Sequence, residues 1–139
     1  MSRTTVHDLV AAARAKVEEL SVAELQAEMA SGAVMVVDIR DFRERIDKGA
    51  IPGSVNAPRG MLEFWFDPES PYHQDRFSLD GRYVLHCASG WRSALAAAAL
   101  QELGATNVAH LRDGFTEWVE SGGEVEDVAE SSSWIRRPR

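Results

Sequence analysis

The sequence contains one cysteine, Cys87, in a setting that would activate a thiol as a nucleophile. It ends the apolar run RYVLHC (82–87), which predicts a buried strand, and a helical pattern over 93–103 begins six residues later. Ligands of a parallel sheet bind beyond the carboxyl ends of its strands, so Cys87 would face the N-terminus of that helix. The free N–H groups and the dipole of a helix N-terminus favour an anion and raise the thiolate fraction. The segment therefore predicts an activated sulfur nucleophile that needs no histidine base.

The loop that follows Cys87 favours the same chemistry. Ala88, Ser89 and Gly90 are small enough for the backbone to curl and to turn successive N–H groups toward the sulfur. A lone cysteine is more often an inert, buried core residue. Core packing, however, does not account for a loop of the pattern small–small–Gly–X–Arg, so we expect these residues to bind the substrate of Cys87.

The last residues of the loop extend this interpretation. Arg92 adds a positive charge at the end of the loop, where it would attract an anionic substrate. Trp91 is expected to project outward, as a wall of the pocket or a docking surface. Ser93 is expected to cap the helix that follows.

The histidines do not mark a base or a metal site. Strand alternation aims His86 at the face opposite Cys87, which favours a structural role. His73 and His110 are distant in sequence, and nothing in their context distinguishes either of them. Because four histidines and one cysteine show no zinc-ligand spacing, we expect no metal and no bound cofactor.

Composition limits the possible partners and surroundings. The chain has 139 residues, 45% hydrophobic and 27% charged, as expected of one soluble globular domain. Its net charge of -7 argues against nonspecific binding to nucleic acid or to anionic membranes. Acidic residues interrupt the N-terminal apolar pattern, and no apolar stretch approaches the ~20 residues of a membrane span. With one cysteine no internal disulfide can form, and we expect a cytoplasmic protein.

Helical and strand patterns alternate through most of the chain. This alternation predicts an α/β fold, with a mostly parallel central sheet flanked by helices on both faces. In chain order we expect a helix over 1–20, a helix from Ser21 to Gly32, a strand over 33–38, a short helix over 42–47 and a brief strand near Val55. In the segment over 59–80, MLEFWF fits one or two helical turns that end at Pro68, and a surface loop follows. We then expect a strand over 82–87, a helix over 93–103, a strand over 107–111 and a short final helix. Residues 124–139 form a polar, aperiodic tail that we expect to be loosely ordered, with Trp134 and Ile135 able to dock on the body.

From about residue 20 to residue 123 the sequence resembles the single-domain rhodanese family. The first motif, VVDIRDFRER, resembles the family's Asp-hydrophobic-Arg signature followed by a glutamate, here Asp38, Arg40 and Glu44. The three side chains are expected to form a buried polar network that braces the sheet edge near the site. The resemblance divides the chain into an N-terminal helix over 1–20, a rhodanese-like domain over 21–123 and the tail.

Two further motifs complete the resemblance. GAIPGSVNAP (49–58) is similar to the family's Gly-His-Ile-Pro-Gly-Ala-x-Asn-x-Pro stretch, with Ala50 where histidine is usual. The loop CASGWR and the element DGFTEW (113–118) match the family's active-site loop and its Gly-Phe-x-x-Trp element. Arg59 follows the second motif directly, and it is either a ligand of the anionic donor on the same rim or an ordinary solvated arginine.

The resemblance implies a sulfurtransferase that works through a persulfide on Cys87. A small donor such as thiosulfate would attach its sulfane sulfur to the thiolate, held in the loop from Cys87 to Arg92. An acceptor such as cyanide, a cellular thiol or a protein thiol would then remove the sulfur, in a double displacement without a cofactor.

Two other functions fit parts of the pattern. Phosphatases and arsenate reductases of rhodanese-like architecture have five residues between the cysteine and the arginine, whereas here only four residues, Ala88 to Trp91, separate Cys87 from Arg92. The loop also offers no carboxylate as a general acid. A non-enzymatic, protein-binding module of the same fold is the other alternative, and such modules often lack the cysteine that this chain retains.

Overall fold

The computed structural model of the protein describes residues 2–131. Its centre is a sheet of five parallel strands in the spatial order β1-β5-β4-β2-β3. The strands are β1 (Glu18–Leu20), β2 (Met35–Asp38), β3 (Val55–Asn56), β4 (Tyr83–His86) and β5 (Val108–Leu111). The helices are α1 (Val6–Lys16), α2 (Val22–Ser31), α3 (Phe42–Lys48), the 3-10 turn η1 (Arg59–Met61), α4 (Leu62–Phe66), α5 (Trp91–Leu103), α6 (Gly114–Glu120) and α7 (Val128–Ser131). Within residues 2–131 no helix is long and apolar enough to cross a membrane.

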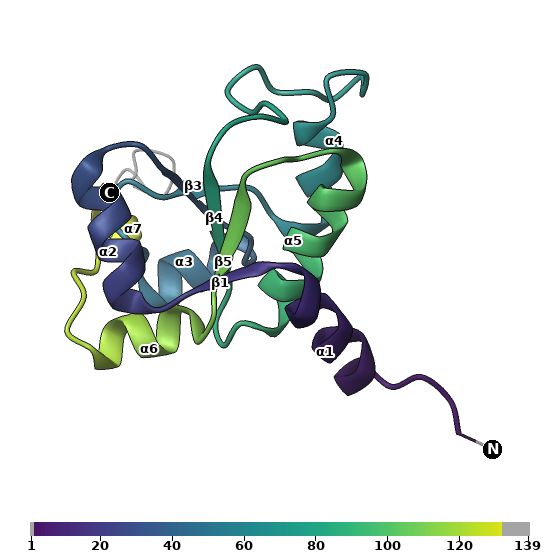
Figure 1. Ribbon diagram of the computed structural model, residues 1–139. Helices are drawn as coiled ribbons and strands as arrows, with labels where there is room; N and C mark the ends of the chain where they lie inside the picture. The colour runs from purple at the N-terminus through teal and green to yellow at the C-terminus, as the bar shows by residue number, and fades with distance from the viewer. Residues whose placement is uncertain (1, 132–139) are drawn as a thin grey trace.

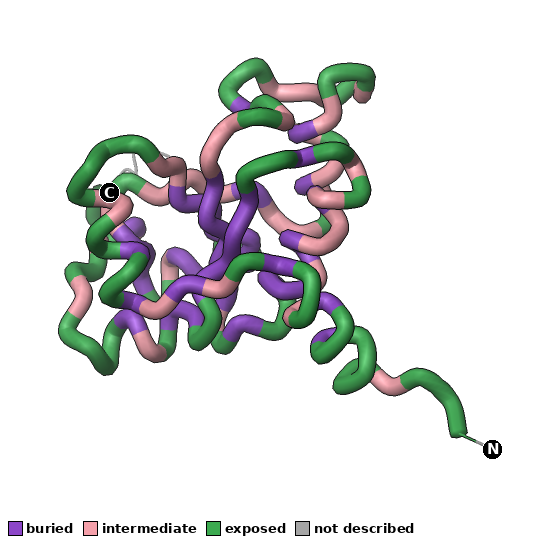
Figure 2. Tube along the Cα trace, viewed as in Figure 1, coloured by how far each residue is buried: buried purple, intermediate pink, exposed green. Residues whose placement is uncertain are grey.

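Helices cover both faces of the sheet, as the sequence predicts. Figure 1 shows α2, α3 and α6 on one side of the strands and α4 and α5 on the other, with α1 beside α5. Residues of β4 and β5 are buried throughout, because a parallel sheet between two helical layers exposes neither face to water (Figure 2). Two apolar clusters fill the layers: one joins the sheet to α4 and α5 and includes Cys87, and the other joins it to α2 and α6.

Local sequence signals account for where several helices begin and end. Ser21 and Glu24 form a capping box at the start of α2, each side chain accepting a hydrogen bond from the other's backbone N–H. Gly32 ends α2 in the left-handed conformation, with φ of 76°.

The predicted helix over 1–20 is wrong at its C-terminal end. The helix stops at Lys16, Val17 is extended, and residues Glu18–Leu20 form β1 beside β5. Val17 and Leu20 are both buried, but a three-residue strand is too short to show its own periodicity. As a result, the N-terminal segment contributes one edge of the central sheet.

The predicted loose tail is also wrong for residues 124–131. Glu126 pairs in antiparallel fashion with Ala50, and the two residues exchange backbone hydrogen bonds of 2.8 and 3.0 Å. The short helix α7 follows, with Val128 buried. These contacts fasten the segment to the turn that the second motif forms. Trp134 and Ile135 lie outside the described residues.

Candidate active site

Cys87 lies where the sequence places it, between the carboxyl end of β4 and the N-terminus of α5. Its side chain is buried, and the backbone N–H of Gly90 donates a hydrogen bond of 3.2 Å to its sulfur. Gly90 precedes α5, which begins at Trp91. The sequence predicts that successive N–H groups of the loop point at the sulfur. Within the part of the chain that the structure describes, the N–H groups of Ala88 and Ser89 make no hydrogen bond to the sulfur, and the contact is made by Gly90.

The start of α6 forms backbone hydrogen bonds with the loop that begins at Cys87. The backbone N–H groups of Phe115 and Thr116 donate to the carbonyl oxygens of Cys87 and Ala88, at 2.9 and 3.0 Å. This close approach requires Gly114, whose φ of 73° is in the left-handed region. A Cβ at this position would overlap the backbone carbonyl group of Ala88. The glycine of the DGFTEW motif therefore sets the position of the active-site loop.

We expect Gly114→Ala to reduce by about a hundredfold the sulfur transfer that the resemblance implies, because the loop must move away from the added methyl group and a shift of about 1 Å misaligns the reacting atoms. Gly122→Ala is the matched control: Gly122 also has a positive φ, of 84°, but a Cβ there has nothing within 4 Å. Both variants carry the backbone strain, and only Gly114→Ala displaces the loop. Transfer rates and thermal unfolding of the two variants would measure this, and equal losses of activity would show that Gly114 does not position the loop.

Glu44 is not part of the buried network in which the sequence placed it. Its carboxylate instead accepts two hydrogen bonds from the guanidinium of Arg92, at 2.9 and 3.1 Å, at a partly exposed site. The hydrogen bond from Arg92 lowers the pKa of Glu44 despite partial burial, and pairing with Glu44 raises the pKa of Arg92. The pair ties the exposed end of the Cys87 loop to α3.

Asp38 and Arg40 do form the predicted buried network, and Arg45 completes it. The carboxylate of Asp38 accepts hydrogen bonds from Arg40 at 2.9 to 3.3 Å and from Arg45 at 3.0 Å. Burial would raise the pKa of Asp38, but the neighbouring His86 and Arg40 hold it below its ordinary value. Burial lowers the pKa of His86, whose ring stacks on Phe115 at 6.0 Å, on the face away from the thiol. The network joins the ends of β2 and β4 beneath the loop.

Two other predicted residues lie at the edge of the site. Arg59 follows β3 on the same edge of the sheet, but its guanidinium pairs with Glu63 at 2.6 Å. Within residues 2–131 it makes no hydrogen bond to the Cys87 loop, so the structure does not bring it to the thiol. Trp91 is partly exposed, as predicted, and its ring meets the edge of the His7 ring at 5.1 Å.

Ser93 differs from its predicted role as a helix cap. Because α5 begins two residues earlier, Ser93 lies inside the helix, buried, with its hydroxyl 3.6 Å from the sulfur of Cys87 and 2.8 Å from Nδ1 of His110. On the other side of the ring, Nε2 of His110 lies 2.9 Å from the carboxylate of Glu19, which also accepts a hydrogen bond of 2.7 Å from Arg14. Sequence reasoning missed His110 and Glu19. A histidine within the buried strand pattern NVAHL was the available signal, since a buried polar group needs a partner.

A pocket of about 470 Å³ borders the loop at Ala88. Its polar wall includes Arg40, Glu44 and Lys48, and its apolar wall includes Phe115 and Val119. A pocket of this size suits a small molecule that carries both charged and apolar groups.

Comparison with known proteins agrees with the fold and the motifs. Residues 21–121 match the rhodanese-like domain family. Over 107 residues the chain is 31% identical to human thiosulfate:glutathione sulfurtransferase, covering 73% of this chain and 92% of that protein. Over 101 residues it is 32% identical to the mouse thiosulfate sulfurtransferase/rhodanese-like domain-containing protein 3, covering 69% of this chain and only 64% of the mouse protein.

A solved structure from Rhodopseudomonas palustris is similar over nearly the whole chain. It is 44% identical, has a TM-score of 0.84, and covers 91% of this chain and 99% of its own. That protein is described as being of unknown function and a possible tyrosine phosphatase. On the match over residues 21–121, the chain belongs to the rhodanese-like domain family, as its motifs indicated.

Proposed function

We propose that the protein is a sulfurtransferase that carries sulfane sulfur as a persulfide on Cys87. The observation that carries this proposal is the sulfur at the N-terminus of α5, 3.2 Å from the N–H of Gly90, in a loop with only four residues between cysteine and arginine. That small ring suits one additional sulfur atom. The sulfurtransferase names of the human and mouse relatives support the same reaction class.

The reaction would run in two displacements. The thiolate of Cys87 attacks the sulfane sulfur of thiosulfate, a new S–S bond forms, and sulfite leaves with the electron pair of the bond that breaks. An acceptor such as cyanide or a thiol then attacks the outer sulfur, and the thiolate of Cys87 is the leaving group. Neither step requires a metal or a cofactor. The name of the human relative supports thiosulfate as donor and a thiol such as glutathione as acceptor.

A phosphatase activity is the second candidate, because the Rhodopseudomonas palustris structure is described as a possible tyrosine phosphatase. Two features of the site oppose it. The loop is one residue shorter than the phosphatase pattern, so its ring is small for a tetrahedral oxyanion. The loop also offers no carboxylate that could serve as a general acid.

A paired assay separates the candidate functions. We expect thiocyanate formation from thiosulfate and cyanide, persulfide transfer to glutathione, and no phosphate release from p-nitrophenyl phosphate. Phosphate release that depends on Cys87, without sulfur transfer, would contradict the proposal in favour of a phosphatase. Neither activity would favour the non-enzymatic binding module.

Arg92 provides a test of how the donor is selected. Thiosulfate brings two negative charges to the mouth of the loop, whereas cyanide brings one and many thiol acceptors bring none. We therefore expect Arg92→Ala to slow the loading of Cys87 by thiosulfate about ten- to a hundredfold, the value of a charge-assisted contact, and to slow discharge of a preloaded persulfide much less. Stopped-flow kinetics can measure the two half-reactions separately.

The partner of Arg92 supplies the opposing variant. Glu44→Gln removes a negative charge next to Arg92, so we expect faster loading by thiosulfate and little change in discharge. Equal losses in both half-reactions for Arg92→Ala would mean that the residue shapes the loop and does not select the donor.

A further inference from the structure

A continuous line of hydrogen-bonding groups leads from the sulfur of Cys87 to a carboxylate in the N-terminal segment. The sulfur lies 3.6 Å from the Ser93 hydroxyl, the hydroxyl lies 2.8 Å from Nδ1 of His110, and Nε2 of His110 lies 2.9 Å from Glu19. Ser93 and the ring of His110 are fully buried. The two displacement steps described above do not use His110 or Glu19.

The chemistry of the partners determines which atom carries each hydrogen. Burial would raise the pKa of Glu19, but hydrogen bonds from Arg14 and His110 hold it below its ordinary value, so the carboxylate is ionised and can only accept. Nε2 of His110 must therefore carry the proton that it donates to Glu19. Burial lowers the pKa of His110, which leaves the resting ring neutral and its Nδ1 free to accept from Ser93. The hydroxyl oxygen of Ser93 then presents lone pairs to the S–H group of Cys87.

We propose that His110 is the base that takes the proton of Cys87, through the hydroxyl of Ser93. The S–H bond breaks and its proton passes to the oxygen of Ser93, while the O–H bond of Ser93 breaks and its proton passes to Nδ1 of His110. The products are the thiolate, an unchanged serine, and an imidazolium that Glu19 holds at Nε2. When the persulfide is discharged and the thiolate returns, the same path in reverse restores the thiol. This inference rests on the proposed function, for which the thiolate is the attacking species.

Some of the charged groups around His110 favour its protonation, and others oppose it. The carboxylate of Glu19, from β1, stabilises the imidazolium, whereas Arg14, from α1, and Arg112, after β5, oppose it. The thiolate of Cys87, at the end of β4, is the other anion of the completed pair. The positive charge on the ring is therefore stabilised most when the thiolate is present, so formation of one ion supports formation of the other.

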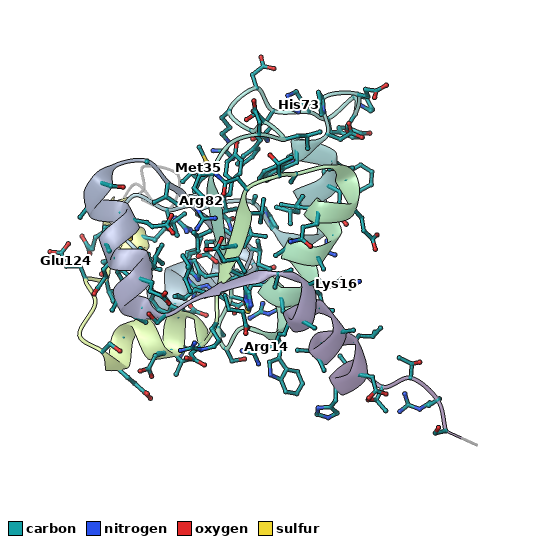
Figure 3. The ribbon with its side chains drawn as sticks, in the orientation of Figure 1. Arg14, Lys16, Met35, His73, Arg82 and Glu124 are labelled. Carbon is teal, nitrogen blue, oxygen red and sulfur yellow. The ribbon has the colours of Figure 1, made fainter. Side chains whose placement is uncertain are left out.

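The N-terminal segment supplies the end of this path. Glu19 and Arg14 precede residues 21–121, which match the family, so the path extends beyond the matched domain. Arg14, labelled in Figure 3, extends from α1 and also donates a hydrogen bond of 2.9 Å to the carbonyl of Arg112. The segment is thus part of the site and not only a cover for the sheet edge.

The thiolate absorbance of the full-length protein, titrated against pH, tests the proposal. Cys87 is the only cysteine, so Cys87→Ser supplies the blank. We expect His110→Gln and Ser93→Ala each to reduce the ratio of thiolate to thiol at neutral pH about ten- to a hundredfold, which raises the titration midpoint by about one to two pH units. The double variant should shift no further than either single variant, because both residues act in one path. His73→Gln, which changes a histidine outside the path, should leave the midpoint unchanged.

If replacing the buried ring in His110→Gln unfolds the protein, Glu19→Gln provides the test instead. Glu19 is only partly buried, and its replacement leaves His110 in place while removing the charge that stabilises the imidazolium, so it should raise the midpoint in the same direction. Folded His110→Gln and Glu19→Gln proteins with the midpoint of the unmodified protein would overturn the proposal. The titration contains no sulfur donor, so a failure of the proposed sulfur transfer would not affect this result.

Discussion

Replacing Cys87 with serine is expected to abolish sulfur transfer, with a loss of at least about a thousandfold, and to leave the fold intact. An alcohol is a far weaker nucleophile than a thiolate and cannot hold a sulfane sulfur. Serine has nearly the same volume, and its oxygen can still accept the hydrogen bond that the N–H of Gly90 donates at this position. Thiocyanate formation from thiosulfate and cyanide, measured alongside thermal unfolding, checks both halves of the expectation.

Cys87→Ala is the companion variant, because it also removes the hydroxyl as a replacement nucleophile. It leaves the N–H of Gly90 without its acceptor, so it should unfold at a somewhat lower temperature than Cys87→Ser. Substantial transfer by either variant would mean that another group carries the sulfur, and the assignment of the site would be wrong.

The second large effect is on stability: Asp38→Asn is expected to lower the free energy of unfolding by about 3–5 kcal/mol. The carboxylate is fully buried and neutralises two buried guanidinium groups, those of Arg40 and Arg45. A neutral amide leaves these charges uncompensated at buried positions. Urea unfolding monitored by tryptophan fluorescence would measure the loss.

A solvent-exposed ion pair provides the control variant, and the pH dependence of the free energy of unfolding provides a second measurement. Arg43→Ala breaks only the solvent-exposed pair with Asp41 and should lower the free energy of unfolding far less than Asp38→Asn does. Because the pKa of Asp38 is lowered in the folded state, its carboxylate stabilises the protein above the pKa of an unfolded aspartate, and this stabilisation is lost as pH falls. The difference between the unmodified protein and Asp38→Asn should therefore narrow in acid. A constant difference, or one no larger than that of Arg43→Ala, would contradict the assigned role of Asp38.

The part of the site that the sequence predicts is the part that lies close together in the chain. Cys87, the small loop and the helix after it form one continuous segment, so their types and spacing specify their geometry. Arg40 lies two residues from Asp38, and this short spacing allows a direct ion pair at the end of one strand. Glu44 follows at helical spacing, which fits either the buried network or an exposed partner, and only the packing of α3 beside the loop directs it to Arg92.

The part that the sequence does not predict depends on the order of strands in the sheet. Glu19 and His110 are 91 residues apart, and they meet only because β1 pairs with β5. Nothing in the sequence specifies this pairing, because β1 is too short to show a strand pattern. Ser93 fits a helix cap because the helical pattern begins at this residue, but α5 begins at Trp91 and turns the hydroxyl inward.

Mass spectrometry of the intact protein after incubation with thiosulfate tests the central claim most directly. A persulfide on Cys87 predicts a gain of one sulfur mass, located at Cys87 by peptide mapping, absent from Cys87→Ser, and removed by cyanide or glutathione. A protein that gains no mass with thiosulfate or other sulfane donors, or that gains it at a residue other than Cys87, would contradict the account.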